Sequence, residues 1–598
     1  MKTWKSIFAV ALSVSTMGMT ILSSGCDMNA LIGGLTGNAS TSQDGSSEGH
    51  IHKWQEVILE EATCTTDGKT LMMCVCGEVK GEVIPAGHDL IREVVSEATC
   101  TQAGLVELYC KNCEYRGTEI QEPRAHSYLE GEKCFWCGKS KSEIESGQMG
   151  EAVAYDGCEV TITFYHTMGK VLRDELDIWI AEFNKLYPNI TIEHKSQGDY
   201  VGLRDSVLSG IASNTLPNLA YCYADHVALY NDYDVVMTLD DYIANVGIVE
   251  RGDGTFELMG LTQEQSDSFV SVYYEEGRMC DDGKMYMLPL LKSTEVLYYN
   301  KTFFEENNLT VPKTWDEMET VMEQIKAIDP YSVPLGYDTE SNWFITMCAQ
   351  SGTPYTSTVE GEKFLFDVEE NHSFVQRFRN WYQNGWVTTE GLEGRYTSDL
   401  FVRTNPSSRK AYMTIASSAG AYYNCPEPYT NAYGRVEYPF EVGVAQIPQI
   451  NVDNPKVTFQ GPSLCMFKNA DSQEMAATWL FMEFLTTTIE LQAQFSLFGG
   501  YASVIKDLDE KCEQYASMLD VTDGNQNLQM TALKQCIAQE NAMFYSPAFI
   551  GSAGAREAVG VLMQNCLRNT PKNGQSVADF IKNEFKENIA KLRKFYGE

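Results

Sequence analysis

The fold is most clearly indicated by LPLLKSTEVLYYNK, residues 288–301. Val296, Leu297 and Tyr298 form a short apolar and aromatic run, which predicts a buried strand. Ser293 and Thr294 come directly before this run, so two small hydroxyl groups stand where they can face a ligand. A strand with hydroxyl groups at one end is a common pattern, and the residues on either side of it are more informative.

Two helices are predicted after this strand. Residues 302–309, TFFEENNL, read as a short helix, and residues 311–318, VPKTWDEM, open a longer one. Thr314 is placed to cap the second helix, and Glu317 follows at the spacing of a capping box. The order strand, short helix, Pro-x-Thr-Trp-Asp-Glu and long helix is far more specific than any of its parts.

The chain before this stretch alternates strands with helices. Residues 160–166 alternate like a strand, residues 171–186 have apolar side chains at helical spacing, and residues 190–193 read as a second strand. A helix through residues 203–211 and a strand at 219–223 complete the pattern. Strand–helix–strand–helix–strand predicts an α/β fold in which helices cover a parallel sheet.

Length and charge restrict the function. At 598 residues the chain is too long for a single core, so two or more compact units are expected. The formal charge is −37, and nucleic-acid binding needs a basic surface that this chain lacks. An acidic surface fits an exported protein. An anionic ligand would have to be held by local groups, because the overall field repels it.

The N-terminus predicts export and anchoring. Residues 1–25 have two early lysines and an apolar region, as in a signal peptide, and end LSSG before Cys26. This sequence is similar to a bacterial lipobox, in which the cysteine is lipidated and holds the protein to the membrane. The alternative is an ordinary secretory signal followed by a chance cysteine. Residues 26–50 are rich in Gly, Ser, Thr and Asn and predict a flexible tether.

Residues 51–142 form a repeat region of about two and a half units. EATCT at 61–65 returns at 97–101, 36 residues later, and histidines recur with the cysteines. Modules this small need an additional cross-link to be stable, and zinc held by Cys and His would supply one. Disulfides are the alternative in an exported protein. The predicted metal ligands are Cys64, Cys74, Cys76, His88, Cys100, Cys110, Cys113, His126, Cys134 and Cys137.

A second linker spans residues 143–157, and residues 158–598 carry a resemblance to a known family. The matching segments are 164–169 (FYHTMG), 198–200 (GDY), 293–301, 413–418 (MTIASS), 461–464 (GPSL), 499–501 (GGY) and 553–557 (AGARE). In this order they resemble the family 1 extracellular solute-binding proteins of ABC importers, and their joint occurrence resembles the glycerol-phosphate branch.

The resemblance implies the architecture. It implies a type II periplasmic-binding-protein-like fold of two α/β lobes that close over a ligand. We expect the first lobe to hold residues 160–289 and 421–462, and the second to hold 293–417 and 467–598. The crossovers are expected near 291–293, 416–419 and 463–468.

The resemblance also implies a set of ligand-binding residues. Arg556 offers a planar fork that can pair with two phosphate oxygens. Ser417 and Ser418 open a predicted helix whose N–H groups suit an anion. Asp225 stands near the place where the branch has a glutamate that binds glycerol hydroxyls, which leaves the identity of the ligand open. The implied residues are Tyr200, Asp225, Ser293, Trp343, Ser417, Ser418, Gly461, Tyr501 and Arg556.

No catalytic pattern accompanies these residues, so an enzyme is not expected; outside the repeats the histidines are few and none lies in a nucleophile motif. The resemblance implies a monomer on the extracellular face of the cell membrane, which delivers glycerol-3-phosphate or a glycerophosphodiester to an ABC permease and needs no cofactor in its binding domain. Three alternatives remain. The same fold could bind an oligosaccharide by stacking on Tyr200, Trp343 and Tyr501. The zinc repeats could instead recognise a partner, and a hydrolase acting on glycerophosphodiesters is disfavoured.

Overall fold

The computed structural model describes residues 54–60, 62–74, 79–84, 86–98, 104–121, 152–280, 282–405, 407–468, 471–520 and 524–597. The chain divides into two compact units, Met1–His88 and Asp89–Glu598, which are described separately. The predicted signal peptide, Cys26, the tether and most of the second linker lie outside the described residues, as do Cys76, Cys100, His126, Cys134 and Cys137. Among the described residues, no helix has the length and apolar character to cross a membrane.

Each of the first two repeats contains a three-stranded antiparallel sheet. The first unit contains β1 (Trp54–Glu60), β2 (Gly68–Cys74) and β3 (Val79–Ile84). The second unit begins with β4 (Leu90–Ser96), β5 (Gly104–Cys110) and β6 (Arg116–Gln121), joined in the same order. The pairing register shifts between Ile58 and Glu60 and again between Val94 and Ser96, which are equivalent positions 36 residues apart. The repeat period in the sequence is therefore also a period of the structure.

The first lobe is built on a five-stranded sheet in the order β12-β21-β9-β7-β8. Strand β7 (Val160–His166) lies parallel to both β8 (Ile190–Ser196) and β9 (Leu219–Cys222), which confirms the prediction for this part of the chain. The joining helices are α3 (Lys170–Leu186) and α4 (Tyr200–Ser213). The lobe also contains α5 (Ala224–Asn231), α6 (Asp240–Ile243), β10 (Ile248–Glu250), β11 (Phe256–Leu258), α7 (Gln263–Ser268), α8 (Ser271–Glu275), η2 (Glu276–Arg278) and β12 (Leu288–Pro289).

The second lobe is built around the buried strand predicted at residues 296–298. This strand, β13 (Leu291–Asn300), lies inside a sheet in the order β15-β14-β16-β13-β20-β23 and also pairs with β19 and β22. The two predicted helices follow as α9 (Lys301–Glu306) and α10 (Trp315–Ile328). The Thr314–Glu317 capping box is present, so the local prediction is confirmed.

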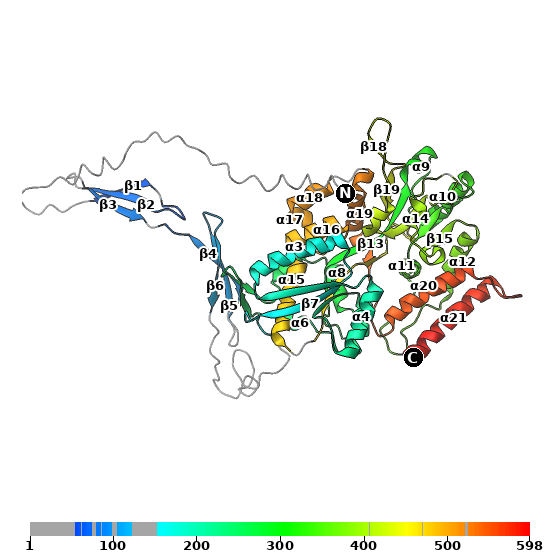
Figure 1. Ribbon diagram of the computed structural model, residues 1–598, viewed down its shortest axis with the longest axis horizontal. Helices are drawn as coiled ribbons and strands as arrows, with labels where there is room; N and C mark the ends of the chain where they lie inside the picture. The colour runs from blue at the N-terminus through cyan, green and yellow to red at the C-terminus, as the bar shows by residue number, and fades with distance from the viewer. Residues whose placement is uncertain are drawn as a thin grey trace, which may run out of the picture. The chain divides into compact units, whose positions relative to one another are not determined.

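The remaining elements complete the two lobes and the connections between them (Figure 1). The C-terminal helices α20 and α21 pack against each other. In chain order the elements are β14 (Leu335–Tyr337), α11 (Glu340–Ser351), α12 (Glu369–Gln383), β15 (Val387–Thr389), α13 (Glu390–Glu393), α14 (Ser398–Phe401), β16 (Met413–Ser417), η3 (Ser418–Asn424), β17 (Tyr429–Thr430), β18 (Val436–Glu437), β19 (Val442–Ala445), β20 (Val457–Gln460), β21 (Ser463–Met466), α15 (Ser472–Thr487), α16 (Ile489–Gly499), β22 (Ala502–Ser503), α17 (Leu508–Lys511), α18 (Glu513–Leu519), η4 (Asn525–Asn527), α19 (Leu528–Ala538), η5 (Glu540–Ala542), β23 (Met543–Phe544), α20 (Ser552–Arg568) and α21 (Val577–Tyr596).

The predicted division of the chain between the lobes is wrong in its second half. Strands β19 and β20 pair with β13 and so belong to the second lobe, whereas β21 pairs with β9 in the first. Helix α15 packs on β7 of the first lobe, and α16 packs on α3. Apolar periodicity identifies a strand but not the sheet that it joins, because that choice depends on pairing across long sequence distances.

The crossovers change accordingly. Residues 416–419 are not a crossover, because Ser417 pairs with Glu295 and η3 packs on β13 and α19 within the second lobe. The chain passes between the sheets at 290–291, at 461–462 and between α16 and β22, after which Ala502 pairs with Lys292. The first predicted crossover is thus confirmed within about one residue, the third is displaced, and the second is wrong.

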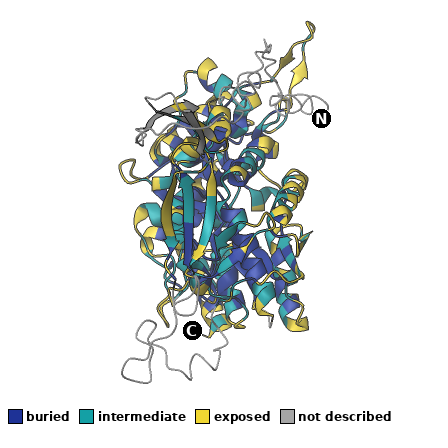
Figure 2. Ribbon diagram, turned by 90° about the vertical axis from the view of Figure 1, so that its left-hand side faces the viewer, coloured by how far each residue is buried: buried dark blue, intermediate teal, exposed yellow. Residues whose placement is uncertain are grey.

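Aromatic side chains fill the core of the second lobe. Trp343 is fully buried and stacks on Phe378, with their ring centroids 3.9 Å apart, and on Tyr337 at 4.9 Å. Trp315 and Trp381 lie beside it, at 6.3 and 6.5 Å. Figure 2 shows buried segments concentrated within the helices and strands of the lobes. This close packing of aromatic rings holds in place the strands that carry the cleft residues.

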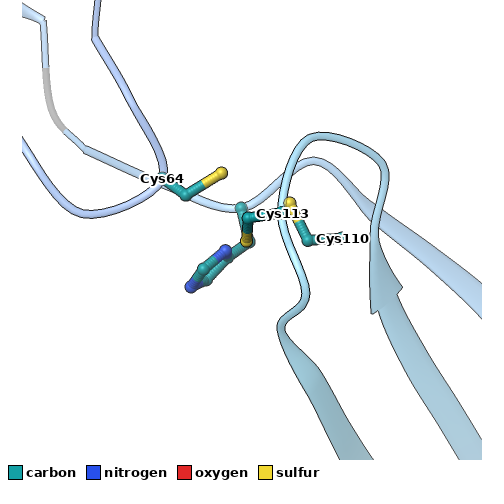
Figure 3. Close-up of side chains that lie close together, drawn as sticks. Cys64, Cys110 and Cys113 are labelled. Carbon is teal, nitrogen blue, oxygen red and sulfur yellow. The ribbon is translucent and has the colours of Figure 1, made fainter. Parts of the chain in front are cut away.

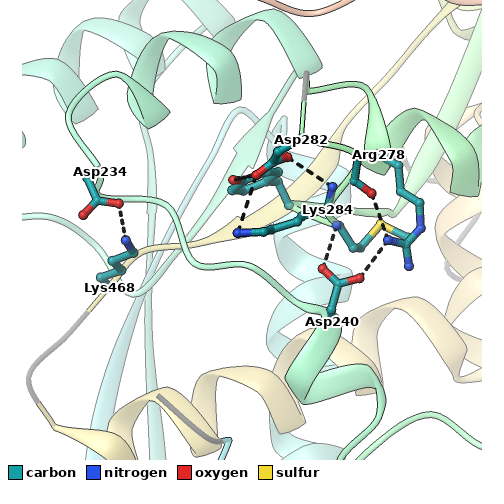
Figure 4. Close-up of polar contacts among 9 residues, drawn as sticks. Asp234, Asp240, Arg278, Asp282, Lys284 and Lys468 are labelled. Atoms are coloured by element: carbon teal, nitrogen blue, oxygen red, sulfur yellow. Dashed lines mark hydrogen bonds and ion pairs between the residues drawn. The ribbon is translucent and has the colours of Figure 1, made fainter. Parts of the chain in front are cut away.

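Polar contacts hold one long connection of the first lobe in place (Figure 4). Arg278 donates to the Asp240 carboxylate at 2.7 Å, and the Met285 N–H donates to the other oxygen of the same carboxylate at 2.9 Å. Asp234 forms an ion pair with Lys468 at the end of β21. Because η2 ends at Arg278, these contacts also fix Glu276, which faces the cleft between the lobes.

Candidate ligand-binding cleft

A cavity of about 60 Å³ lies between the two lobes. Its wall on the first lobe comes from the start of α5 and from η2. Its wall on the second lobe comes from β20, from the loop after β23 and from the start of α20. The lining residues are Tyr223, Ala224, Asp225, Glu276, Tyr355, Thr458, Phe459, Gln460, Tyr545, Ser546, Pro547, Ala548, Ser552 and Arg556.

Arg556 and Asp225 meet across this cavity. Arg556 Nη1 donates to the Asn342 side-chain oxygen at 2.6 Å, and Arg556 Nε lies 3.7 Å from Asp225 Oδ2. Asn342 is itself fixed, because its amide donates to the Gln460 side chain at 2.8 Å. A guanidinium has five N–H donors. Asn342 and Asp225 can take only part of this set, so the fork is oriented and retains donors for an anion.

Tyrosines from the first lobe and from the passage between α16 and β22 lie near this pair. Tyr200, at the start of α4, stacks on Tyr223 with ring centroids 4.3 Å apart and an interplanar angle of 23°. The preceding Asp199 caps α4 by accepting from the Gly202 N–H at 2.8 Å, which fixes the first turn of the helix. Burial, together with the nearby Tyr223 and Tyr501, raises the pKa of Tyr200 well above its usual range. These phenols therefore stay neutral and can donate hydrogen bonds.

The two neighbouring serines of the predicted site differ in their exposure to solvent. Ser417 is exposed, and its Oγ accepts from the Ala419 N–H at 3.2 Å. Ser418 is fully buried, and its Oγ accepts from the Thr294 N–H at 3.2 Å. The predicted helix start is a 3-10 segment, so it lacks the aligned peptide dipoles of a long α-helix. Ser417 is therefore the more accessible of the two, and neither serine is among the residues that line the cavity.

Three further predicted residues have structural explanations. Gly461 has a φ of +119°, and a Cβ there would lie 2.4 Å from the Leu291 carbonyl oxygen. The close approach that requires glycine is thus to β13. Ser293 is 5% exposed and pairs in register with Gln460 beside the crossover. Trp343 lies in the core of the second lobe rather than in the cavity wall, which corrects its predicted place.

Glu276 and Tyr355 are cavity residues that sequence reasoning missed. Glu276 accepts from the buried ammonium of Lys292 at 2.6 Å, and this ammonium also donates to Ser463 Oγ at 2.8 Å. Lys292 was the only available signal, since a charged residue lies between leucine and serine in an otherwise buried strand. Tyr355 follows α11 in a loop without a motif, so nothing in the sequence points to it.

Predicted metal ligands lie close together within each compact unit. In the second unit, Cys110 ends β5 and Cys113 lies in the turn before β6, with their sulfur atoms within 4.8 Å (Figure 3). The Asn112 N–H approaches Cys110 Sγ at 3.5 Å, a contact that favours a thiolate. In the first unit, a ligand atom of His88 lies within 4.8 Å of the Cys64 sulfur. The predicted ligand pairs in the described residues therefore have geometry compatible with zinc.

Comparison with known proteins establishes the family. The sequence pattern of the family described as "Bacterial extracellular solute-binding protein" matches residues 179–518. The chain belongs to this family. Its relatives are solute-binding proteins of ABC transporters, so the chain is a binding protein and not an enzyme, and the family binds its solutes without a cofactor.

Individual relatives agree with this assignment. The sn-glycerol-3-phosphate-binding periplasmic proteins UgpB of Escherichia coli (strain K12) and Shigella flexneri serotype 5b (strain 8401) are each 23% identical over 369 residues, which covers 60% of this chain and 76% of theirs. UgpB from Mycobacterium tuberculosis, solved with glycerophosphocholine, has a TM-score of 0.57 at 16% identity and covers 73% of this chain and 99% of its own.

Sugar-binding proteins share the same architecture. The GacH receptor of Streptomyces glaucescens, solved with and without acarbose, has a TM-score of 0.54 at 15% identity and covers 73% of this chain and 99% of its own. At this identity the likeness shows the fold alone. The predicted two-lobed fold is thus confirmed, and the choice between a phosphate and a sugar depends on the cleft residues.

Proposed function

We propose that this protein captures glycerol-3-phosphate or a glycerophosphodiester between its lobes and delivers it to an ABC permease. The observation that carries the proposal is the Arg556 fork, which Asn342 and Asp225 orient into the interlobe cavity. Bidentate pairing with phosphate oxygens suits this group. Asp225 supplies an acceptor for ligand hydroxyl groups in the same space. The ligand would bind the closed arrangement more tightly and so shift the lobes toward it.

The second candidate is an oligosaccharide. The stacked Tyr200–Tyr223 pair offers a flat aromatic face of the kind on which sugar rings pack. This alternative uses the same cleft but has no need for a guanidinium fork. Trp343 does not offer the stacking surface that this alternative expects, because its ring is fully buried in the core.

A melting scan with three ligands separates the two candidates. Full-length protein would be heated alone and with sn-glycerol-3-phosphate, glycerophosphocholine or maltose. A ligand at 100 times its dissociation constant stabilises the folded state by roughly 2.7 kcal/mol. Stabilisation by either phosphate ligand supports the proposal. Stabilisation by maltose alone would transfer the function to sugars, and no shift with any of the three would reject both candidates.

We further propose that this protein is held at the cell surface. The lipobox-like sequence before Cys26 supports a lipid anchor, and the tether and repeats would hold the binding domain away from the membrane. We further propose that the repeats bind zinc through their Cys and His residues, as a structural staple without a role in uptake. A lipid attached to Cys26 would increase the measured mass of the purified mature protein.

A further inference from the structure

The interlobe cavity has an acidic lining. Of the residues that line it, the charged ones are Asp225, Glu276 and Arg556, so two carboxylates face the cavity with one guanidinium. Arg556 Nε lies 3.7 Å from Asp225 Oδ2, so these two charges offset each other. The charge of Glu276 has no counterpart within the lining. It would repel a phosphate in the same space, because like charges interact strongly where water is largely excluded.

Lys292 supplies the missing positive charge from behind the cavity wall. Lys292 is not a lining residue, and its side chain is 1% exposed. Its Nζ donates to Glu276 Oε2 at 2.6 Å. The Glu276 side chain is itself largely buried, so dissolved salt screens the attraction between the two charges only weakly. With Lys292 included, the positive and negative charges around the cavity balance.

Further contacts hold the Lys292 ammonium in one position. It donates to Ser463 Oγ at 2.8 Å and to the Gly461 carbonyl oxygen at 3.4 Å, and it lies 5.4 Å from the centroid of the Phe459 ring. A buried lysine is costly unless its charge is paired and its N–H groups are bonded. An ammonium has three donors, and Glu276, Ser463 and Gly461 accept from them. Any effect of Lys292 on ligand binding is therefore indirect.

We propose that Lys292 is a positioning residue for anion capture, which holds Glu276 in place and cancels its charge so that an anionic ligand can approach Arg556. This role rests on the proposed function and deepens it, because it assigns part of the selectivity for charge to a residue that does not touch the ligand. Local compensation matters in a chain whose formal charge is −37, since the overall field already opposes an anion.

The test compares two ligands that differ in charge. At pH 8, sn-glycerol-3-phosphate carries about two negative charges and glycerophosphoglycerol, a phosphodiester, carries about one. Both would be titrated into full-length wild type, Lys292→Met, Glu276→Gln and the double variant Lys292→Met/Glu276→Gln. Lys292→Met leaves the Glu276 carboxylate uncompensated. It should weaken binding of the monoester at least about 30-fold and of the diester at least about fivefold.

Removal of the carboxylate should restore binding. The double variant lacks both charges of the pair, and it should bind each ligand within about twofold of wild type. Glu276→Gln, which keeps the Lys292 charge without its counterpart, should bind both ligands more tightly than wild type does. The control Glu275→Gln removes the same charge from an exposed neighbouring residue and should match wild type. Melting scans show whether each variant is folded.

Each outcome supports or overturns this role. Unchanged affinity in Lys292→Met, equal weakening for the two ligands, or a double variant that binds no better than Lys292→Met overturns it and leaves the proposed function standing. If Lys292→Met does not fold, Glu276→Gln should still bind the phosphates more tightly than the double variant, by a larger factor for the monoester, and equal affinities would overturn the role. If wild type binds neither phosphate, the proposed function fails and this role fails with it.

Discussion

The β4–β6 sheet and the second lobe bury apolar side chains to very different extents. On β4, Leu90, Ile91 and Val94 are 39–48% exposed, although Leu105 and Val106 on β5 are buried. In the second lobe, Trp343 and Phe378 are fully buried. The lobe can therefore be held together by packing, whereas a three-stranded sheet with half its apolar residues exposed needs a further constraint. The cysteine pair at the β5–β6 turn is placed to supply it.

Removal of zinc should have the largest effect, and it should be confined to the repeats. Structural zinc contributes about 10–16 kcal/mol to small metal-binding domains, so a strong chelator is expected to unfold β4–β6. Hydrogen exchange of peptides from 104–121 would rise, while the exchange of β13 would not change. Cys113→Ser should lower the zinc content of the purified protein. If the purified protein contained no zinc and its mass were lower by two hydrogens for each cysteine pair, disulfides would supply the constraint instead.

A core truncation should have the next largest effect, and it should affect the lobe alone. Trp343→Ala removes a fully buried ring that stacks on Phe378 and is expected to destabilise the domain by about 3–5 kcal/mol. Ile91→Ala, at a side chain 47% exposed on β4, should change stability by less than about 0.5 kcal/mol. Urea unfolding followed by tryptophan fluorescence measures both. If the two variants lost comparable free energy of unfolding, the β4–β6 sheet and the second lobe would not differ in how strongly packing stabilises them.

A buried carboxyl group in the lobe should make stability depend on pH. Burial raises the pKa of Glu295 to about 7, and the Tyr337 hydroxyl donates to this side chain at 2.6 Å. The folded protein therefore retains a proton that the unfolded chain releases near its ordinary pKa of 4.5. Stability from this group is present below about pH 4.5 and falls by up to roughly 3 kcal/mol as the pH rises to about 7.

Glu295→Gln should remove this fall, since the amide keeps an acceptor for Tyr337 and does not titrate. The difference in unfolding free energy between pH 5 and pH 8 should shrink relative to wild type in urea titrations. Glu369→Gln, at a side chain 80% exposed, is the matched control and should leave the difference unchanged. An equal pH dependence in wild type and Glu295→Gln would show that the group is not buried in its protonated form.

Deletion of the repeats should have the smallest effect. A chain without residues 51–142 is expected to bind the ligand with an affinity within about twofold of the full chain, because every residue that lines the interlobe cavity comes from the lobes. Calorimetry of both proteins with the same ligand measures this. Loss of affinity in the shortened chain would assign recognition to the repeats.

Local structure was predictable from the sequence, and long-range pairing was not. The strand at β13, the helix α10 and its Thr314–Glu317 capping box depend on residues close together in the chain. The sheet joined by β20 depends on pairing with Ser293, more than 160 residues earlier, for which periodicity carries no signal. The strands of the repeats were missed because the cysteine spacing was interpreted without reference to the alternating residues between them.

The candidate site was predictable only where a motif marked it. Arg556 and Asp225, which the comparison of motifs named separately, lie 3.7 Å apart in the structure, and their roles in binding stay predictions. Trp343 and Gly461 were assigned to the ligand through the family resemblance, yet the first packs in the core and the second allows the chain to pass close to β13. Tyr355 comes from a loop whose place in the cleft depends on how the second lobe packs, so only the structure could reveal it.

A phosphate site at Arg556 is tested by calorimetric titration of sn-glycerol-3-phosphate into full-length wild type and Arg556→Ala. Charge-assisted hydrogen bonds are worth about 1.5–3 kcal/mol, so we expect saturable binding in wild type that weakens at least about tenfold in the variant. Arg568→Ala, at an exposed arginine on the same helix, should bind as wild type does. Equal binding by wild type and Arg556→Ala, or no binding by wild type, would contradict the assignment of a phosphate site to this cleft.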